Sequence, residues 1–173
     1  TQDAKQGLNK IFDGIPTFDT PKPVRLIKRC LQLTTSNDEN DIVLDFFAGS
    51  GTTAQSVIEQ NLEDDGNRRF ILIQLPEICA EDSEASKAGF STISEIMKER
   101  VRRVINKLNE EDKGKFELDG KQDRGFRVFK LAESNFKAWD ATAPKDGKAL
   151  EKQLELHIEH IREGRTSEDI LYE

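Results

Sequence analysis

The chain has 173 residues, of which 35% are hydrophobic and 34% are charged, and its formal net charge is -7. This length suits one main compact domain, and the composition is typical of a globular protein with a very polar surface. The net negative charge argues against this chain providing the main nucleic-acid-binding surface, because phosphate contacts require clustered Lys and Arg.

Cysteine content and hydropathy indicate the cellular compartment, and the spacing of cysteines and histidines argues against a metal site. Cys30 and Cys79 are far apart and lack the spacing of a zinc site or a disulfide framework, so a reducing cytoplasm is expected. No apolar run has the length of a membrane span, so no membrane partner is expected. His157 and His160 stand one helical turn apart without a further ligand group nearby, and no metal site is expected.

The first predicted helix follows an irregular segment. Residues 1–19 are polar and contain Gly14 and Pro16, which predicts an irregular conformation. From Thr20 the string TPKPVRLIKRCLQL places prolines near a first helical turn, where a missing N–H does no harm. Apolar residues then recur on one helical face, which predicts a helix that ends near Thr34.

Two apolar runs of strand length come next, at residues 42–47 and 70–75. Between them, Ala48-Gly49-Ser50-Gly51 breaks the first run, and apolar residues at helical spacing predict a helix from Thr52 to Leu62. A strand, a helix and a second strand make a βαβ unit, which implies a parallel sheet covered on both faces. The predicted fold class is therefore α/β.

A long helix is predicted after Thr92. Thr92 and Glu95 form a capping box, and an apolar stripe continues from Ile93 to Leu108. Basic residues on this helix are interleaved with Glu95 and Glu99, which is typical of an ordinary solvated helix surface rather than a phosphate-binding face. These basic residues are Lys98, Arg100, Arg102, Arg103 and Lys107.

The C-terminal part is predicted to contain one strand and one helix. Residues 125–131 alternate apolar and polar side chains, which predicts a half-exposed third strand at a sheet edge. Residues 149–161 predict a last helix, and residues 141–173 are interpreted as a truncated C-terminal helical extension.

The two ends of the chain suggest a larger parent. Residues Thr166 to Asp169 resemble a capping box that has no room to open a helix before Glu173. The chain also begins at Thr1 without a methionine. We therefore expect it to be a fragment of a longer protein.

The most informative string is DFFAGSGTT, at residues 45–53, between a predicted strand and a predicted helix. Its glycines let a ligand approach the backbone closely, and the free N–H groups of a helix start attract a negative group. A phosphate-binding loop of the NTPase type needs a Lys after its last glycine, whereas Thr52 follows Gly51 here. A dinucleotide-binding turn is nominally satisfied by Gly49, Gly51 and Ala54.

The acid before this turn discriminates between the possible ligands. Asp45 would lie close to a pyrophosphate and repel it. S-adenosylmethionine instead offers an ammonium and a sulfonium group to Asp45, and its own carboxylate to the helix start. A tight strand-to-helix turn without any ligand remains the structural alternative, because short glycine patterns also arise by chance.

Three strings carry a resemblance to a known family. DFFAGSGTT is similar to the cofactor-binding motif I of β-class amino-methyltransferases, and FDTPKPVRLIKRCLQL resembles the motif X that precedes motif I in that class. NRRFILIQLPE resembles the DNA adenine-N6 methyltransferases that form the modification subunits of type III restriction systems. The similarity runs from about Phe18 onward. It implies a Rossmann-like α/β methyltransferase fold, a parallel sheet flanked by helices, with S-adenosylmethionine bound by a domain at residues 20–140.

The resemblance also implies a set of cofactor-binding residues. Motif I is expected to surround the methionine part of the cofactor, and motif X to close the same pocket. Gln74 stands where many relatives have an acid that accepts the ribose hydroxyls, and Glu77 is expected to replace that charge. The full set is Thr20, Lys22, Pro23, Asp45, Phe46, Phe47, Ala48, Gly49, Ser50, Gly51, Thr52, Thr53, Gln74, Leu75 and Glu77.

One motif of the family is missing. Adenine-N6 methylation normally uses an Asp-Pro-Pro-Tyr motif to hold the flipped base, and no two prolines of this chain are adjacent. No catalytic residue is therefore expected in this chain, and the chain alone is expected not to methylate DNA.

The resemblance implies double-stranded DNA, a second modification (Mod) subunit and a restriction (Res) subunit as partners of the longer protein. Two other functions remain open: an assembly module of the restriction complex, and an NAD-binding Rossmann domain.

Overall fold

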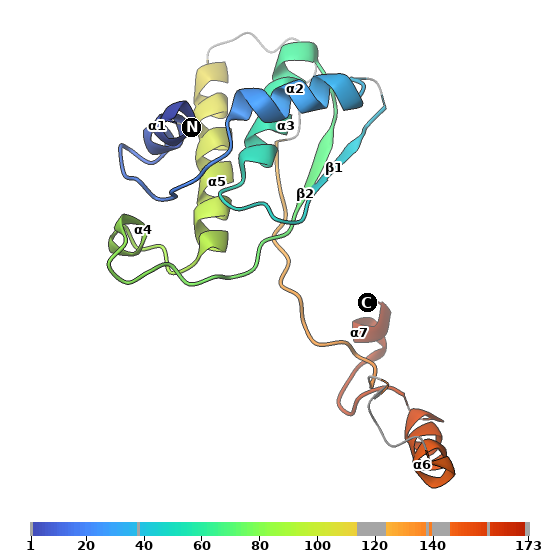
Figure 1. Ribbon diagram of the computed structural model, residues 1–173. Helices are drawn as coiled ribbons and strands as arrows, with labels where there is room; N and C mark the ends of the chain where they lie inside the picture. The colour runs from blue at the N-terminus through green and yellow to red at the C-terminus, as the bar shows by residue number, and fades with distance from the viewer. Residues whose placement is uncertain are drawn as a thin grey trace. The chain divides into compact units, whose positions relative to one another are not determined.

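The computed structural model describes residues 2–37, 39–113, 124–137, 139, 146–158 and 160–171, without the side chains of 156–158 (Figure 1). The predicted His157 and His160 pair therefore lies partly outside the described residues. The chain forms two compact units, Thr1–Gly125 and Phe126–Glu173. The predicted domain spans residues 20–140, whereas the first unit begins earlier, at Thr1, and ends earlier, at Gly125. The role of this domain in cofactor binding stays a prediction.

A βαβ unit forms the centre of the first compact unit. Strand β1 (Ile42–Asp45) leads into helix α3 (Thr52–Asp64), which leads into strand β2 (Arg69–Leu72). The two strands pair in parallel, with Ile42 opposite Arg69 and Asp45 opposite Leu72. This pairing confirms the predicted strand, helix and strand, although both strands are shorter than the apolar runs that predicted them.

Helix α2 (Val24–Thr34) packs against α3. Pro23 occupies the N-cap position with extended backbone angles, where its missing N–H costs no hydrogen bond. The helix ends at Thr34, as the sequence predicted. The inner side of helix α3 is buried, and the apolar residues on it include Ala54, Val57 and Ile58.

One face of the sheet is not covered by the described residues. Side chains of both strands alternate between half-buried and exposed positions. The exposed fractions on the open face are 54% for Ile42, 55% for Leu44, 50% for Ile71 and 52% for Ile73. Within the first unit, the helices cover only the other face of this two-stranded sheet, so the predicted coverage of both faces is not found there. The complete Rossmann-like fold stays a prediction.

The first residues form helix α1 (Gln2–Ile11), so the predicted irregular conformation is wrong for this stretch. Leu8 and Phe12 are each only 1% exposed, and they share a core cluster with Ala85 and Ile96. Its apolar residues Ala4, Leu8, Ile11 and Phe12 follow helical spacing, but a helix of 10 residues depends on the tertiary packing of that side. Figure 1 shows α1 beside α5, with which it is in contact.

Helix α5 (Ile93–Asp112) follows the short helix α4 (Glu84–Lys87) and begins with the predicted capping box. The Glu95 N–H donates to the Thr92 hydroxyl oxygen at 3.3 Å, and the Thr92 N–H donates to the Glu95 carboxylate at 3.3 Å. Val101 and Val104 of the predicted apolar stripe are buried.

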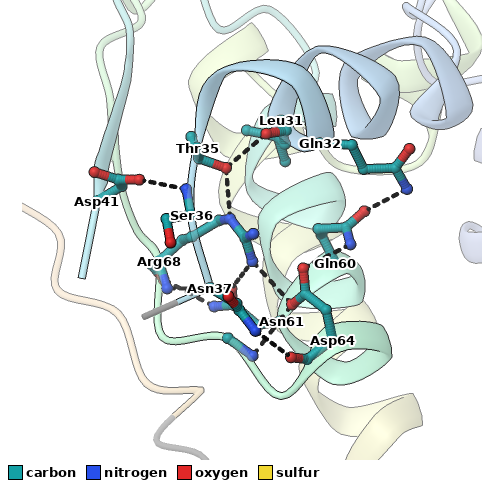
Figure 2. Close-up of polar contacts among 11 residues, drawn as sticks. Leu31, Gln32, Thr35, Ser36, Asn37, Asp41, Gln60, Asn61, Asp64 and Arg68 are labelled. Atoms are coloured by element: carbon teal, nitrogen blue, oxygen red, sulfur yellow. Dashed lines mark hydrogen bonds and ion pairs between the residues drawn. The ribbon is translucent and has the colours of Figure 1, made fainter. Parts of the chain in front are cut away.

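A polar cluster joins the amino end of the sheet to the ends of α2 and α3 (Figure 2). We call Thr35, Asn61, Asp64 and Arg68 the Arg68 cluster. The Arg68 guanidinium donates to the Thr35 hydroxyl at 2.6 Å and to the Asp64 carboxylate at 2.9 Å. The Asn61 amide donates to the Arg68 carbonyl at 2.8 Å. A Cβ atom at Gly66 would meet the Arg68 guanidinium and lie 2.7 Å from the Asp64 carboxylate, so a larger residue there would displace the side chains of this cluster.

The second unit contains helices α6 (Gly147–Ile158) and α7 (Ser167–Leu171). Helix α6 confirms the predicted last helix. The third strand predicted at residues 125–131 is wrong: these residues form no ladder in the described chain, and Leu131 is fully exposed. A strand needs a partner edge for its backbone groups, and the described residues offer none to this segment.

The predicted capping box near the C-terminus is confirmed. The Asp169 N–H donates to the Thr166 hydroxyl at 3.2 Å, and the Thr166 N–H donates to the Asp169 carboxylate at 2.8 Å. A short helix, α7, does form there, so the expectation that it had no room is wrong. Across the described parts of the chain, no helix has both the length and the apolar character needed to cross a membrane.

Candidate functional site

The loop between β1 and α3, at residues 46–51, is the glycine turn. Gly49 has φ of 51° and Gly51 has φ of 78°, in the left-handed region that favours glycine. Gly51 is the N-cap residue of α3, and no side chain caps this helix. A Cβ atom on Gly51 would lie 3.0 Å from the Met97 Cγ atom. The turn therefore presents a helix start whose first N–H groups have no side-chain acceptor.

Asp45 stands at the end of β1, directly before the glycine turn. One carboxylate oxygen accepts from the Phe47 N–H at 3.1 Å, and the other accepts from the Thr53 hydroxyl at 2.5 Å. These two bonds fix the carboxylate against both sides of the turn. Each oxygen of a carboxylate has a second lone pair, so Asp45 can still accept from a cationic group.

Gln74 connects the end of β2 to the same turn. Its amide oxygen accepts from the Gly49 N–H at 2.7 Å, and its NH2 group donates to the Glu77 carboxylate at 3.2 Å. The structure thus brings Gln74 and Glu77 together beside Gly49. The amide oxygen that was expected to accept from a ribose hydroxyl is already bonded to the turn, and its ribose role stays a prediction.

The segment before α2, which contains the string similar to motif X, also contacts the turn. The Thr52 hydroxyl donates to the Lys22 carbonyl at 3.3 Å. A Cβ atom on Gly49 would lie 3.4 Å from the Phe18 ring, so this ring packs directly on the glycine. Thr20 is exposed, and Pro23 starts α2. The proximity of Lys22 to the turn is observed, whereas closure of a pocket by Thr20, Lys22 and Pro23 stays a prediction.

Apolar side chains are exposed around the turn. Phe46 and Phe47 are both exposed, and their ring centroids lie 5.1 Å apart. Leu75, just after Gln74, is exposed as well. In contrast, Ala48, Ser50, Thr52 and Thr53 are buried. Among the predicted cofactor residues, the buried part of the turn thus lies beside an exposed apolar group formed by Phe46, Phe47 and Leu75.

Arg100 is a site residue that sequence reasoning missed. It was assigned to a solvated helix surface, but it is only 2% exposed. Its guanidinium donates to the Ser50 hydroxyl at 2.9 Å, to the Ser50 carbonyl at 3.2 Å and to the Thr52 hydroxyl at 2.9 Å. The spacing contained a signal, because position 100 continues the buried series of Ile96 and Val104 at intervals of four.

Burial also changes the acidity of this arginine. Loss of contact with water lowers the pKa of the Arg100 guanidinium to about 10, while the Glu59 carboxylate acts in the opposite direction. The group remains positively charged at neutral pH. A positive charge therefore lies beneath the start of α3, where it adds to the positive end of the helix dipole.

A shallow, open groove lies between α2 and α3, and none of the predicted cofactor residues lines it; the lining residues are Val24, Arg25, Lys28, Arg29, Gln32, Glu59 and Glu63. Within the described ranges, no group of three or more His, Cys, Asp or Glu side chains could hold a metal ion.

Sequence comparisons identify the family. Residues 2–84, which include the glycine turn and Gln74, match a protein family described as DNA methylase. The chain is also 41% identical over 130 residues to the type III restriction-modification enzyme StyLTI Mod subunit of Salmonella typhimurium, a match that covers 74% of this chain. The chain belongs to the DNA methylase family. The predicted resemblance to type III modification subunits is thereby confirmed.

Two further relatives agree with this assignment. The chain is 44% identical over 94 residues, 54% of its length, to the type III restriction-modification enzyme EcoPI Mod subunit of Escherichia phage P1. It is 38% identical over 104 residues, 60% of its length, to the type II methyltransferase M.KpnI of Klebsiella pneumoniae. The matches cover 19%, 14% and 24% of the Salmonella, phage and Klebsiella proteins, so the chain spans about a fifth of the length of these relatives.

Proposed function

We propose that this chain binds S-adenosylmethionine at the glycine turn, as the cofactor-binding part of a longer, site-specific DNA adenine-N6 methyltransferase. The observation that carries the proposal is the position of Asp45. A carboxylate at the end of β1 lies across the glycine turn from an uncapped helix start, so one short loop offers an acceptor for a cation and donors for an anion.

The charges of the cofactor fit this arrangement. S-adenosylmethionine carries an ammonium group and a sulfonium group that suit Asp45, and a carboxylate that suits the first N–H groups of α3. Gly49 and Gly51 both have positive φ, a backbone conformation that favours glycine and that shapes the turn where the cofactor would lie. A pyrophosphate would meet the Asp45 carboxylate instead, which favours this cofactor over NAD.

Residues beyond the turn would hold the adenosine part. In this proposal Gln74 and Glu77, which are bonded to each other, face the ribose. Phe46, Phe47 and Leu75 are exposed and apolar, and they would cover the adenine ring. Thr20, Lys22 and Pro23 would close the pocket from the side of α2.

The cofactor supplies an activated methyl group when it is bound, and the residues of this chain would hold it in a fixed orientation. We propose that the groups that bind the target adenine lie outside this chain, because no Asp-Pro-Pro-Tyr motif is present in it. The Salmonella and phage relatives are Mod subunits of type III restriction-modification enzymes. By analogy, the longer protein would act on double-stranded DNA, form a Mod dimer and associate with a Res subunit.

Calorimetric titration of the 173-residue chain with S-adenosylmethionine, S-adenosylhomocysteine and NAD tests the proposal. We expect the first two ligands to bind and Asp45→Ala to weaken both by about tenfold or more, because a charge-assisted hydrogen bond contributes about 1.5–3 kcal/mol. Asp41→Ala is the matched control, since Asp41 precedes the same strand and bonds the Ser36 N–H. Thermal melting of each variant verifies that it is folded.

The other outcomes assign the remaining functions. Binding of NAD alone would favour an oxidoreductase domain. No binding of any of the three ligands would favour an assembly module, which the uncovered apolar face of β1 and β2 also supports. Equal affinities of the wild-type chain and Asp45→Ala would disprove the role of Asp45.

A further inference from the structure

Arg100 reaches the glycine turn from a distant part of the chain. It lies on α5, and its guanidinium bonds three residues of the turn and of α3. Three of these bonds are those to Ser50 and Thr52, and the fourth is a donation to the Gln55 amide oxygen at 2.9 Å. Arg100 is only 2% exposed, and these bonds hold its side chain in one place. Arginine suits this position because its planar fork presents several donors in fixed directions.

The atoms bonded to this guanidinium are all neutral. They are a carbonyl, two hydroxyls and an amide oxygen. Among the described residues, no ion pair joins Arg100 to a carboxylate, and Glu59 acts on it only through space. A buried charge without a bonded counterion is costly, since hydrogen bonds to neutral groups only partly replace hydration. An anion that arrives at the glycine turn would supply the missing negative charge.

The same bonds fix the two residues on either side of the start of α3. Ser50 and Thr52 flank the N-cap residue Gly51, which has no side chain that could cap the helix. The hydroxyl oxygens of Ser50 and Thr52 both accept from Arg100. The first N–H groups of α3 therefore have no side-chain acceptor in the described chain.

We propose that Arg100 is a positioning residue that makes the glycine turn selective for the carboxylate of S-adenosylmethionine. It acts in two ways, by fixing Ser50 and Thr52 on either side of the helix start and by adding a positive charge beneath it. This inference rests on the proposed function, because it specifies which group of the cofactor lies at the start of α3.

The experiment compares two ligands that differ only in the carboxylate. S-adenosylmethionine and its decarboxylated analogue share the sulfonium, the amine and the adenosine, and each is titrated into the 173-residue chain by calorimetry. We expect the wild-type chain to bind the carboxylate-bearing ligand about tenfold more tightly, in line with a charge-assisted contact. In Arg100→Gln we expect this preference to disappear through weaker binding of S-adenosylmethionine, with unchanged or slightly stronger binding of the analogue.

Arg103→Gln is the matched control. Arg103 lies on the same helix and the substitution changes the net charge equally, but its guanidinium bonds Glu99 at 2.8 Å and Asp13 at 2.7 Å instead of the turn. We expect Arg103→Gln to retain the preference for the carboxylate. Melting curves and circular dichroism of all variants report whether they are folded.

Each result decides the proposal. An equal loss of affinity for both ligands in Arg100→Gln would mean that Arg100 only supports the fold of the turn, and would overturn the inference. If Arg100→Gln does not fold, the wild-type comparison decides instead: equal affinity for the two ligands overturns the inference, and a preference retained in Arg100→Lys supports it. Failure of the wild-type chain to bind S-adenosylmethionine at all would overturn the proposed function, and this inference with it.

Discussion

Two buried arginines of the first unit have different surroundings. Arg68 is paired with the Asp64 carboxylate at 2.9 Å, and its side chain is only 3% exposed. Arg100 bonds only neutral atoms in the described structure. The charge of Arg68 is thus balanced within the fold, which indicates a structural role, whereas the charge of Arg100 is balanced only through space. The partners of each arginine, rather than its burial, separate the two roles.

The Asp64 carboxylate makes the stability of the first unit dependent on pH. Burial raises its pKa, but the bonds from Arg68 and Gln60 together outweigh this effect, and the pKa lies below 3.8. A lowered pKa in the folded state adds stability above pH 3.8, and this stability is lost as the pH falls through the folded-state pKa. We expect Asp64→Asn to lower the free energy of unfolding by about 1–3 kcal/mol at neutral pH, because Arg68 loses its counterion.

Urea unfolding at neutral pH and below pH 3 measures this dependence. The difference between the wild-type chain and Asp64→Asn should shrink in acid, where the wild-type carboxylate also takes up a proton. Asp65→Asn is a suitable control, since Asp65 is exposed and adjacent, and asparagine tolerates its left-handed backbone. A difference that stays constant with pH would contradict this account of Asp64.

At the scale of helices and strands, the sequence predicted those elements whose apolar pattern is regular. The βαβ unit, α2, α5 and α6 were all predicted with the correct type. Helix α1 was missed, because its buried residues are few and its stability comes from the cluster around Phe12. The strand predicted at residues 125–131 does not form, for a related reason. The alternation of apolar and polar residues shows which side chains share a face, but a strand also needs the edge of a partner strand.

The candidate site was predicted where residues are close in sequence. Asp45, Gly49 and Gly51 could be recognised together because strand, turn and helix follow one another. The contribution of Gln74 to the turn depended on the parallel pairing, which the βαβ pattern already implied. Arg100 could not be assigned to the turn, because nothing in the sequence states how α5 packs against α3. The spacing of Arg100 from Ile96 and Val104 is compatible with a buried position, but the interleaved Glu95 and Glu99 favoured a surface position.

The capping box of α5 is expected to stabilise the first unit measurably. Thr92→Ala removes the hydroxyl that accepts from the Glu95 N–H, and the loss of such a cap costs about 1 kcal/mol. Thermal and urea unfolding report the change, and Thr92→Ser should restore most of the stability. Thr34→Ala is the control, because its exposed hydroxyl only bonds back to the Cys30 carbonyl within α2. Equal stability of Thr92→Ala and the wild-type chain would show that the cap contributes nothing.

For the molecule as a whole, the described residues leave the sheet incomplete on one side. Ile42, Leu44, Ile71 and Ile73 expose an apolar surface that a compact domain normally buries. The Salmonella and phage relatives are about five and about seven times as long as the matched regions, so most of their sequence has no counterpart in this chain. The first unit therefore contains the proposed cofactor site on a sheet of only two strands.

The 173-residue chain alone is expected to bind its cofactor without methylating DNA. Transfer to an adenine amine requires a pocket that holds the flipped base, and the motif that normally provides it is absent. Transfer of a radiolabelled methyl group from S-adenosylmethionine to adenine-containing duplexes measures this, with a full-length Mod subunit as the positive control. Turnover comparable to that control would contradict the expectation.

The bonds of Arg100 connect positions 45 to 50 residues apart in the chain. The glycine turn therefore keeps these bonds only while α5 is docked against α3, and α5 in turn is packed against α1. Under the proposed function, cofactor affinity and the docking of α5 would be linked, and each would shift the other by the same factor. A substitution in α1 that weakens its packing on α5 would then change cofactor occupancy at the turn, although α1 lies remote from the proposed ligand.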